Sequence, residues 1–214
     1  MRRDKLWIKI HGKPVIEHTL AVFQRCRAIQ SIILVVGPAT ESRFEKLKAR
    51  NSKLQTIVSG GRERQDSVWH GLLALPPGTT IAVIHDGARP CVTPRLISHT
   101  VAAARKFGAA IAATPITDTV KEVRRSTLHA QRSLPRIIRT LDRSKLWAAQ
   151  TPQAFRADLI RRAYGRVIQR KLIVTDDAVA VELLGKPVHL VENLAANLKI
   201  TRPADVELAR HILC

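Results

Sequence analysis

The sequence predicts an α/β protein with a mostly parallel sheet and helices on both of its faces. Helix-like and strand-like segments alternate from one end of the chain to the other. The strand-like segments are short, continuous apolar runs, as expected for strands that are buried on both faces. A chain of 214 residues with 45% hydrophobic content suits one domain with a sizeable core. We therefore expect residues 1–214 to form a single domain.

The first half of the chain supplies the start of this alternation. Ile16, Leu20 and Phe23 recur at helical spacing after Pro14, which predicts a helix over 14–27. The β-branched run SIILVVG at 31–37 predicts a buried strand. The series continues with a helix at 41–49, a strand at 55–61, a helix through QDSVWHGLLAL and a strand at 79–87.

The second half follows the same rule. Thr93 and Pro94 predict the start of a helix, and Gly108 predicts its end. A strand is expected at 109–116. Further helices are expected near 156–170, at 176–184 and at 203–213, with strands PVHLVEN at 187–193 and NLKIT at 197–201.

Residues 117–142 interrupt the alternation. This segment is too polar and basic for a core element, although its RIIRT sequence can pair as a strand. We expect a basic hairpin arm at about 117–142 that projects from the domain.

The net charge of +19 favours an anionic partner, such as nucleic acid or a phosphorylated metabolite. Basic residues crowd between 121 and 171, where the only aromatic residues are Trp147, Phe155 and Tyr164. A surface for single-stranded nucleic acid would interleave more stacking platforms. A solvated basic face, or one that serves a phosphorylated substrate, is therefore favoured over a nucleic-acid surface.

The sequence also indicates a cellular location. No apolar run approaches the roughly 18 residues of a membrane span, and the basic first residues do not resemble a signal peptide. We expect no membrane partner and a cytoplasmic location. The cysteines, Cys26, Cys91 and Cys214, lack zinc-ligand or redox spacing and are interpreted as free thiols.

Polar residues follow several predicted strands, at the sheet edge where α/β proteins bind ligands. Gly60, Gly61 and Ser67 follow one strand, and a paired glycine turn lets a ligand approach the backbone. Asp86 and Arg89 follow another strand. Each group alone is commonly structural.

Two further strand ends strengthen the prediction of a phosphate site. Thr119 and Lys121 follow the strand at 109–116, and Lys199 and Arg202 lie in the last predicted strand region. Together they offer several phosphate-compatible donors around one acid, Asp86, whose carboxylate suits Mg²⁺.

The motifs together resemble 2-C-methyl-D-erythritol 4-phosphate cytidylyltransferases over essentially the whole chain. The matching stretches are GKPVIEHTL, SGGRERQDSV, VIHDGARP, TPITDTVK, RTLDR, AAQTPQAF, TDDA and NLKITRP. The resemblance implies a Rossmann-like nucleotidyltransferase that uses Mg²⁺. Such an enzyme joins CTP and 2-C-methyl-D-erythritol 4-phosphate into CDP-methylerythritol, in non-mevalonate isoprenoid synthesis, and releases pyrophosphate.

The same resemblance implies roles for individual residues. Lys5, Gly61, Ser67, Asp86 and Gly87 would bind the nucleotide, with Asp86 also near the metal. Thr119, Arg143 and Lys199 would bind the acceptor, and Lys5, Arg143 and Lys199 would be catalytic. The arginine matching Arg143 reaches in from a neighbouring subunit in the family, which implies a homodimer with the arm as its dimerisation element.

One part of the family pattern does not occur in this sequence. The family has a first strand and a glycine-rich loop, Ala-Ala-Gly-x-Gly-x-Arg-Met, which cradles the triphosphate. Met1 aligns with the end of that loop. This comparison predicts a start upstream of Met1 or a fragment, with impaired activity of the chain as given and exposed edges on the strands that would flank the first strand.

Other functions stay open at this point. The acceptor could be another polyol phosphate such as ribitol 5-phosphate, or the chain could be an inactive homologue that acts as a basic binding protein. Arg64, Asp66 and Arg89 are expected to hold the loops of the site, and His85 is expected to pack rather than to act as a base.

Overall fold

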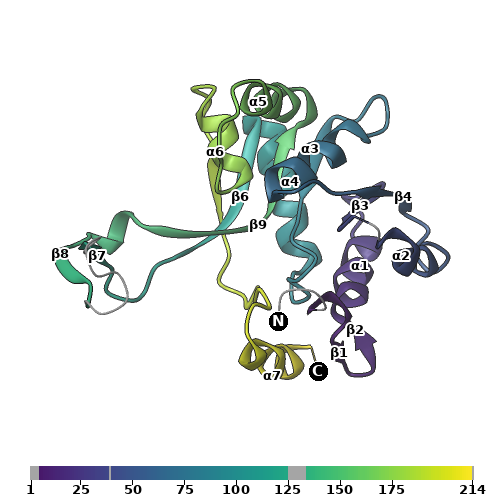
Figure 1. The fold of residues 1–214 in the computed structure, drawn as a ribbon, viewed down its shortest axis with the longest axis horizontal. Coiled ribbons are helices and arrows are strands. Elements are labelled where there is room, and N and C mark those ends of the chain that lie inside the picture. The colour runs from purple at the N-terminus through teal and green to yellow at the C-terminus, as the bar shows by residue number, and fades with distance from the viewer. Residues whose placement is uncertain (1–4, 39, 125–133, 214) are drawn as a thin grey trace.

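The computed structural model describes residues 5–38, 40–124 and 134–213. It shows an α/β fold with a body of strands and helices and an arm that projects from it (Figure 1). Among the described residues, no helix is long and apolar enough to cross a membrane.

The main sheet has four strands in the order β10-β6-β9-β5. The strands are β5 (Ile81–Ile84), β6 (Ala109–Pro115), β9 (Trp147–Arg156) and β10 (His189–Glu192). β10 runs parallel to β6, whereas β9 runs antiparallel to both β6 and β5. The sheet is therefore mixed, because the chain returns from the arm through β9 instead of crossing over through a helix.

A separate two-stranded parallel sheet contains β3 (Ile32–Val36) and β4 (Leu54–Ser59). The sequence predicted both strands. Among the described residues, β3 hydrogen-bonds along one edge to β4 and β5 along one edge to β9, and no backbone ladder joins β3 to β5.

Helices cover both faces of the main sheet, as predicted. The helices are α1 (Val15–Arg25), α2 (Glu41–Lys48), α3 (Arg64–Leu73), α4 (Pro94–Phe107), α5 (Ala157–Gln169), α6 (Asp177–Glu182) and α7 (Pro203–Ile212). One core cluster contains Leu72, Tyr164 and Val181 from α3, α5 and α6, and another contains Phe23 and Val101 from α1 and α4. These two clusters lie against different sets of sheet residues and make up the two hydrophobic layers of the body.

Helix α4 begins and ends where its sequence predicted. Thr93 Oγ1 accepts a hydrogen bond of 3.2 Å from the backbone N–H of Leu96, which satisfies a free donor of the first turn. Gly108 ends the helix with φ of 92°, a left-handed conformation that glycine adopts without steric cost.

The predicted strand at 197–201 is wrong. These residues form no strand, although the backbone N–H of Ile200 donates to the carbonyl of Ala88 at 2.9 Å. The amide of Asn197 donates to the carbonyl of Thr151 at 2.8 Å, so a side chain rather than a backbone ladder attaches this segment to β9. The sequence analysis also predicted no strand at β9, because apolar and polar residues do not alternate over Trp147–Arg156.

The arm is a hairpin, as predicted. β7 (Lys121–Arg124) pairs antiparallel with β8 (Arg136–Thr140), and the sequence between them includes 125–133, which lie outside the described residues. Figure 1 shows this hairpin well away from the body. Its exposed apolar side chains are Val123, Leu134, Ile137 and Ile138.

Short elements connect the rest. These are the 3-10 helices η1 (Lys5–Trp7) and η2 (Arg143–Lys145) and the strands β1 (Lys9–Ile10) and β2 (Lys13–Pro14). β1 and β2 form a small hairpin around His11 and Gly12, both with positive φ. This hairpin leads directly into α1.

Candidate functional site

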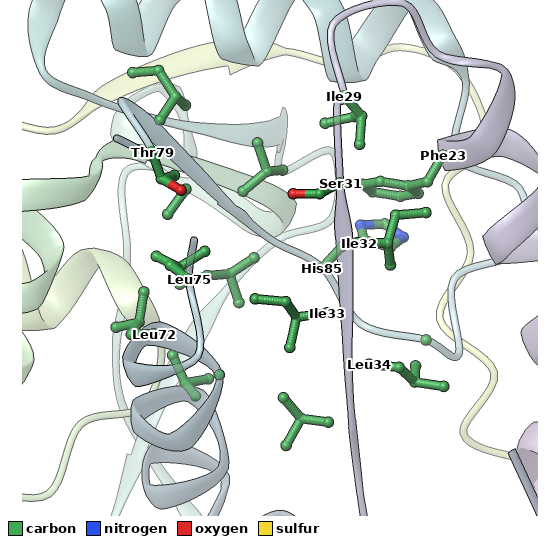
Figure 2. Close-up of a pocket in the computed structure, with 18 of the residues that line it drawn as sticks. Phe23, Ile29, Ser31, Ile32, Ile33, Leu34, Leu72, Leu75, Thr79 and His85 are labelled. Carbon is green, nitrogen blue, oxygen red and sulfur yellow. The ribbon is translucent and has the colours of Figure 1, made fainter. Parts of the chain in front are cut away.

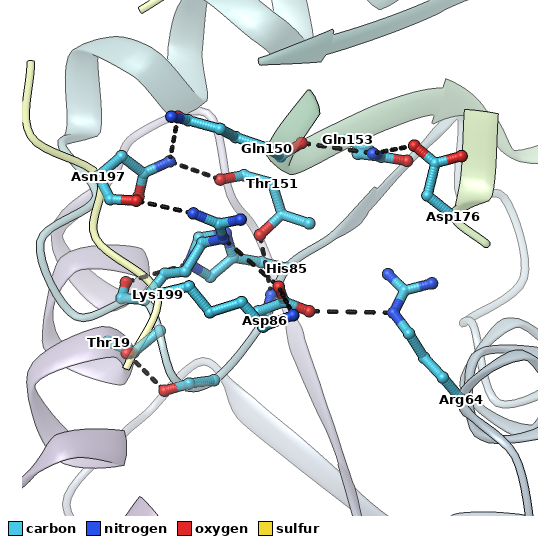
Figure 3. Close-up of polar contacts among 12 residues, drawn as sticks. Thr19, Arg64, His85, Asp86, Gln150, Thr151, Gln153, Asp176, Asn197 and Lys199 are labelled. Atoms are coloured by element: carbon cyan, nitrogen blue, oxygen red, sulfur yellow. Dashed lines mark hydrogen bonds and ion pairs between the residues drawn. The ribbon is translucent and has the colours of Figure 1, made fainter. Parts of the chain in front are cut away.

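The candidate site is centred on Asp86, two residues beyond the end of β5. Its backbone N–H donates to Thr151 Oγ1 at 3.1 Å, which fixes the strand end against β9. Its carboxylate lies 2.9 Å from Lys199 Nζ and 3.4 Å from Arg89 Nε (Figure 3). The structure therefore brings the predicted residues Asp86 and Lys199 into direct contact.

Arg64 is the third cation around Asp86. Its Nε atom lies 3.9 Å from Asp86 Oδ1, and its two terminal nitrogens donate to Asp177 at 2.9 and 2.7 Å. Asp177 is completely buried at the start of α6 and also accepts a hydrogen bond from the Tyr164 hydroxyl. Arg64 thus links a buried carboxylate to the carboxylate of the site.

The surrounding cations keep Asp86 ionised. Burial raises the pKa of Asp86. The hydrogen bond from Lys199 and the charges of Lys199, Arg64 and Arg89 lower this pKa by more than burial raises it, so the net pKa lies below the ordinary value. Lys199, Arg89 and Arg64 thus surround one carboxylate, and Arg64 is also paired with Asp177. Such a cluster at the carboxyl ends of strands suits a phosphate-bearing ligand.

A cavity of about 310 Å³ opens beside this cluster. Its lining includes the three cations and Asp86, together with Gln150, Thr151 and Gln153 of β9 and Asp176. Figure 3 shows Gln150 and Thr151 of β9 beside Asn197, and Gln153 of β9 beside Asp176. The site is therefore assembled from β5, β9, α3 and the segment before α7.

The segment that carries Lys199 is attached at Asn197. The Asn197 amide donates to Gln150 Oε1 at 3.0 Å, and the Asn197 carbonyl accepts from Arg89 at 2.7 Å. Arg89 therefore holds a loop, as the sequence analysis expected, while it also contacts Asp86.

The glycine turn before α3 is tightly packed. The backbone N–H of Gly61 donates to Ser67 Oγ at 3.1 Å. A Cβ on Gly61 would lie 2.2 Å from Asp66 Cβ, and one on Gly60 would lie 2.7 Å from Ser67 Oγ. The turn itself requires the glycines, and the proposed nucleotide contacts of Gly61 and Ser67 stay predictions.

Gly87 follows Asp86 in the chain and packs against Ile16 and Leu6. The carbonyl of Gly87 accepts from Thr19 Oγ1 at 2.9 Å, and a Cβ on Gly87 would lie 3.0 Å from Ile16 Cδ1. Leu6, next to Lys5, also packs near Gly87. Among the described residues, Lys5 forms no hydrogen bond or ion pair with the Asp86 cluster, so its role stays a prediction.

Thr119 and Arg143 are not part of this cluster. Both are exposed, Thr119 before β7 and Arg143 at the start of η2. Arg143 donates to the carbonyl of Thr117, within the same region of the arm. Neither lines the cavity beside Asp86. Within this chain the structure therefore separates Thr119 and Arg143 from the other predicted acceptor residue, Lys199.

Sequence reasoning assigned no function to Asp177, Thr151 or Gln150, and it expected Arg64 only to hold a loop of the site. Arg64 and Asp177 form a bidentate pair across α3 and α6, and Thr151 and Gln150 hold the ends of β5 and the Lys199 segment. The available signal was their occurrence in the stretches SGGRERQDSV, TDDA and AAQTPQAF. Their pairing depends on tertiary contacts and has no spacing signature.

His85 packs as expected. Its ring lies 4.9 Å from the ring of Phe23, measured between centroids. Burial, with a smaller contribution from the charge of Arg89, lowers its pKa to about 4. The imidazole is therefore neutral near pH 7.

The side chains around Asp86 suit a magnesium ion only if the substrate supplies its other ligands. The described residues contain no group of three or more acidic, histidine or cysteine side chains that could hold a metal. Asp86 offers one ionised carboxylate beside a cation-rich cavity. Magnesium commonly binds one or two protein carboxylates and completes its shell with water and substrate phosphates, so Asp86 suits an ion that arrives with a triphosphate.

The fold and this site are those of an α/β nucleotidyltransferase. The chain belongs to the 2-C-methyl-D-erythritol 4-phosphate cytidylyltransferase family, whose family model matches residues 1–214. The match covers every element described above.

Individual relatives agree with this assignment. The cytidylyltransferase of this name from Pelotomaculum thermopropionicum is 44% identical over 98% of this chain and 86% of its own length. The crystal structure of 4-diphosphocytidyl-2C-methyl-D-erythritol synthase from Anaerococcus prevotii has a TM-score of 0.85 and 31% identity, over 96% of this chain and 88% of its own. The crystal structure of the Thermus thermophilus cytidylyltransferase has a TM-score of 0.81 and 30% identity, and the match covers 98% of this chain and 93% of that chain.

Proposed function

We propose that this protein transfers the cytidylyl group of CTP to 2-C-methyl-D-erythritol 4-phosphate. The observation that carries the proposal is the contact of Asp86 with Lys199, Arg64 and Arg89 at the carboxyl end of β5. Family membership identifies the two substrates. The structure supplies a cavity whose lining includes three cations that two anionic substrates can contact.

In this proposal a phosphate oxygen of the acceptor attacks the α-phosphorus of CTP. A new P–O bond forms, the bond to the β-phosphate breaks, and pyrophosphate leaves with the electron pair. The reaction requires no covalent intermediate on the protein, so the protein contributes positioning and charge compensation.

Lys199, Arg64 and Arg89 are the described residues placed to compensate this charge. Lys199 pairs with Asp86 in the free protein and can turn toward an incoming phosphate, because its side chain is 39% exposed. Arg64 is held in one orientation by Asp177, which reduces the entropy lost when an anion binds. We propose that Lys5, Gly61, Ser67 and Gly87 contact the nucleotide.

Asp86 would hold Mg²⁺ together with the triphosphate. When bound, the ion neutralises charge that develops on the phosphate oxygens. Asp86 itself remains available for this role because its pKa is below the ordinary range.

We further propose that the protein acts as a homodimer through the arm. Thr119 and Arg143 are exposed and separate from the Asp86 cavity of their own subunit. The apolar side chains Val123, Ile137 and Ile138 on the same hairpin offer a surface for a partner subunit. Thr119 and Arg143 would then complete the acceptor site of that partner.

The test measures pyrophosphate release with CTP, Mg²⁺ and one of two acceptors, 2-C-methyl-D-erythritol 4-phosphate or ribitol 5-phosphate. We expect release with the first acceptor and a loss of about 100-fold in kcat/KM for Lys199→Ala, the scale of removing one transition-state donor. Lys186→Ala, a change at an exposed lysine outside the site, should leave the rate unchanged. Preference for ribitol 5-phosphate, or equal rates for both variants, would contradict the proposal.

A further inference from the structure

Tyr164 is a completely buried residue of α5 whose hydroxyl has a charged partner. Its ring belongs to the core cluster that contains Leu72 and Val181, and its hydroxyl donates to Asp177 Oδ1 at 2.5 Å. Burial and, after it, the charge of Asp177 raise the pKa of Tyr164, so the phenol stays protonated and remains a donor. No step of the proposed reaction uses this hydroxyl.

Asp177 accepts hydrogen bonds from two residues. Besides the Tyr164 hydroxyl, the two terminal nitrogens of Arg64 donate to its two oxygens at 2.9 and 2.7 Å. A completely buried carboxylate needs such partners to remain charged. The bond from Tyr164 reaches Oδ1 from α5, whereas Arg64 reaches both oxygens from α3, so the carboxylate is held from two helices.

The backbone on both sides of Asp177 is fixed to β9. Gln153 Nε2 donates to Asp176 Oδ2 at 3.1 Å, and Gln153 Oε1 accepts from the backbone N–H of Ala178 at 3.2 Å (Figure 3). Gln153 belongs to the same strand that holds the backbone of Asp86. The start of α6 and the end of β5 therefore share one support.

Arg64 has a second edge that Asp177 does not occupy. Its Nε atom lies 3.9 Å from Asp86 Oδ1, which is too long for a hydrogen bond. Among the described residues, this Nε–H has no hydrogen-bond acceptor. Arg64 lines the cavity beside Asp86, and the Nε edge of a guanidinium carries two N–H groups that match two oxygens of a phosphate.

Apolar surroundings limit the other positions of Arg64. A second cavity, of about 430 Å³, borders both Arg64 and Asp86. Figure 2 shows Ile33, Leu72 and Leu75 among the residues that line it. Such side chains accept no hydrogen bond from a guanidinium. An Arg64 side chain that lost its buried partner would therefore move toward the carboxylate of Asp86.

We propose that Tyr164 is a positioning residue for anion binding. Its hydroxyl fixes the carboxylate of Asp177, and Asp177 holds Arg64 so that the Nε edge is directed to the cavity and stays out of hydrogen-bond contact with Asp86. A phosphate group that enters the cavity then meets donors that are already aligned. The identity of this phosphate as part of a substrate rests on the proposed function.

The first experiment compares Tyr164→Phe, which removes only the hydroxyl, with Thr100→Val. Thr100 is also completely buried, and its hydroxyl donates to the carbonyl of Leu96 at 2.8 Å within α4. Calorimetric titration with magnesium pyrophosphate and with magnesium CTP gives Kd, well below the melting temperature of each variant. We expect Kd to rise about ten-fold in Tyr164→Phe and less than about two-fold in Thr100→Val. Equal Kd values, or equal losses in both variants, would overturn the proposal.

A double-mutant cycle tests whether Tyr164 acts through Arg64. Lysine keeps the charge of Arg64→Lys but cannot form the bidentate pair with Asp177. Tyr164→Phe should therefore weaken pyrophosphate binding no further in the Arg64→Lys background. A further loss of about ten-fold there would show that Tyr164 acts by another route and would overturn the proposal.

A third measurement needs neither a ligand nor a variant. Nitrogen NMR should show rotation about the Nε–Cζ bond at least about ten-fold slower for Arg64 than for Arg162, whose pair with Asp158 is exposed. Equal rates would overturn the proposal. Tyr164→Phe should speed this rotation in Arg64 alone.

The outcomes for the reaction are separate. Absence of pyrophosphate release by a protein whose pyrophosphate Kd depends on Tyr164 would contradict the proposed function only. Turnover by Tyr164→Phe with unchanged KM and Kd would overturn the positioning role only.

Discussion

Lys199 Nζ lies 2.9 Å from Asp86 Oδ2, although Asp86 follows β5 and Lys199 comes from the segment before α7. The contact depends on two other attachments, since Thr151 holds the backbone of Asp86 and Asn197 holds the Lys199 segment to β9. β9 therefore holds Asp86 and Lys199 in contact, although β9 contributes no charged side chain to the site.

Asp86 should make the protein more stable above its folded pKa. Its pKa is lowered in the folded state, so the unfolded chain takes up the proton first as the pH falls below about 4. The stabilisation is present above the unfolded value near 3.8 and is lost as the pH falls through the folded value. In urea titrations at several pH values, Asp86→Asn should therefore reduce the loss of unfolding free energy that accompanies acidification. The exposed control Asp118→Asn should retain that loss, and an unchanged loss in Asp86→Asn would contradict the assignment.

His85 should affect stability in a different pH window. Its pKa is lowered to about 4 in the folded protein, against an ordinary value of 6.5, so the unfolded chain binds more protons between these values. Stability should fall by about 3 kcal/mol as the pH drops from above 6.5 to below 4, at 1.36 kcal/mol per unit. His85→Gln should remove this slope in thermal unfolding measured across pH, and the exposed control His99→Gln should keep it.

The pair of Arg64 and Asp177 should be worth more than a surface pair. Asp177 is fully buried, and Asp177→Asn leaves Arg64 without its bidentate partner, which we expect to cost about 3 kcal/mol. The exposed pair Arg162 and Asp158 should contribute less than ~1 kcal/mol. Double-mutant cycles on both pairs, by urea unfolding, provide the comparison. A coupling at the buried pair no larger than at the exposed pair would refute this account.

Subunit mixing should show on which side of the dimer Arg143 acts. Arg143→Ala and Lys199→Ala should each be nearly inactive. If Arg143 serves the partner's site, half of the dimers formed on mixing are heterodimers, each with one intact site, so about one quarter of the wild-type rate returns. Pyrophosphate release measures this recovery. No recovery, or a monomer in sedimentation, would contradict the proposed arm-mediated site.

Gly61 should tolerate no side chain. Gly61→Ala places a Cβ 2.2 Å from Asp66 Cβ and must displace the first turn of α3, which carries Ser67. We expect a cost of about 1–3 kcal/mol and a lower melting temperature. Gly165→Ala is the matched control, because a Cβ there meets nothing within 4 Å and lies in the interior of α5, where alanine is favoured over glycine. Equal melting temperatures of the two variants would show that the clash is relieved at no cost.

Local features of the fold were predictable from the sequence. Apolar periodicity and end signals located α4 between Thr93 and Gly108, and the basic composition of 117–142 indicated the projecting hairpin. These features depend on neighbours within a few residues, so the sequence carries them directly. Motif resemblance likewise pointed to Asp86 and Lys199 as members of one site.

The remaining features needed the tertiary structure. The antiparallel course of β9 and the pair of Arg64 with Asp177 each depend on segments far apart in the chain. Most of the elements and most of the candidate residues were predictable from the sequence, since propensity and pattern are local. Only tertiary packing decided which of these residues meet, because the burial of apolar faces brings distant strand ends together and sets the charges around each carboxylate.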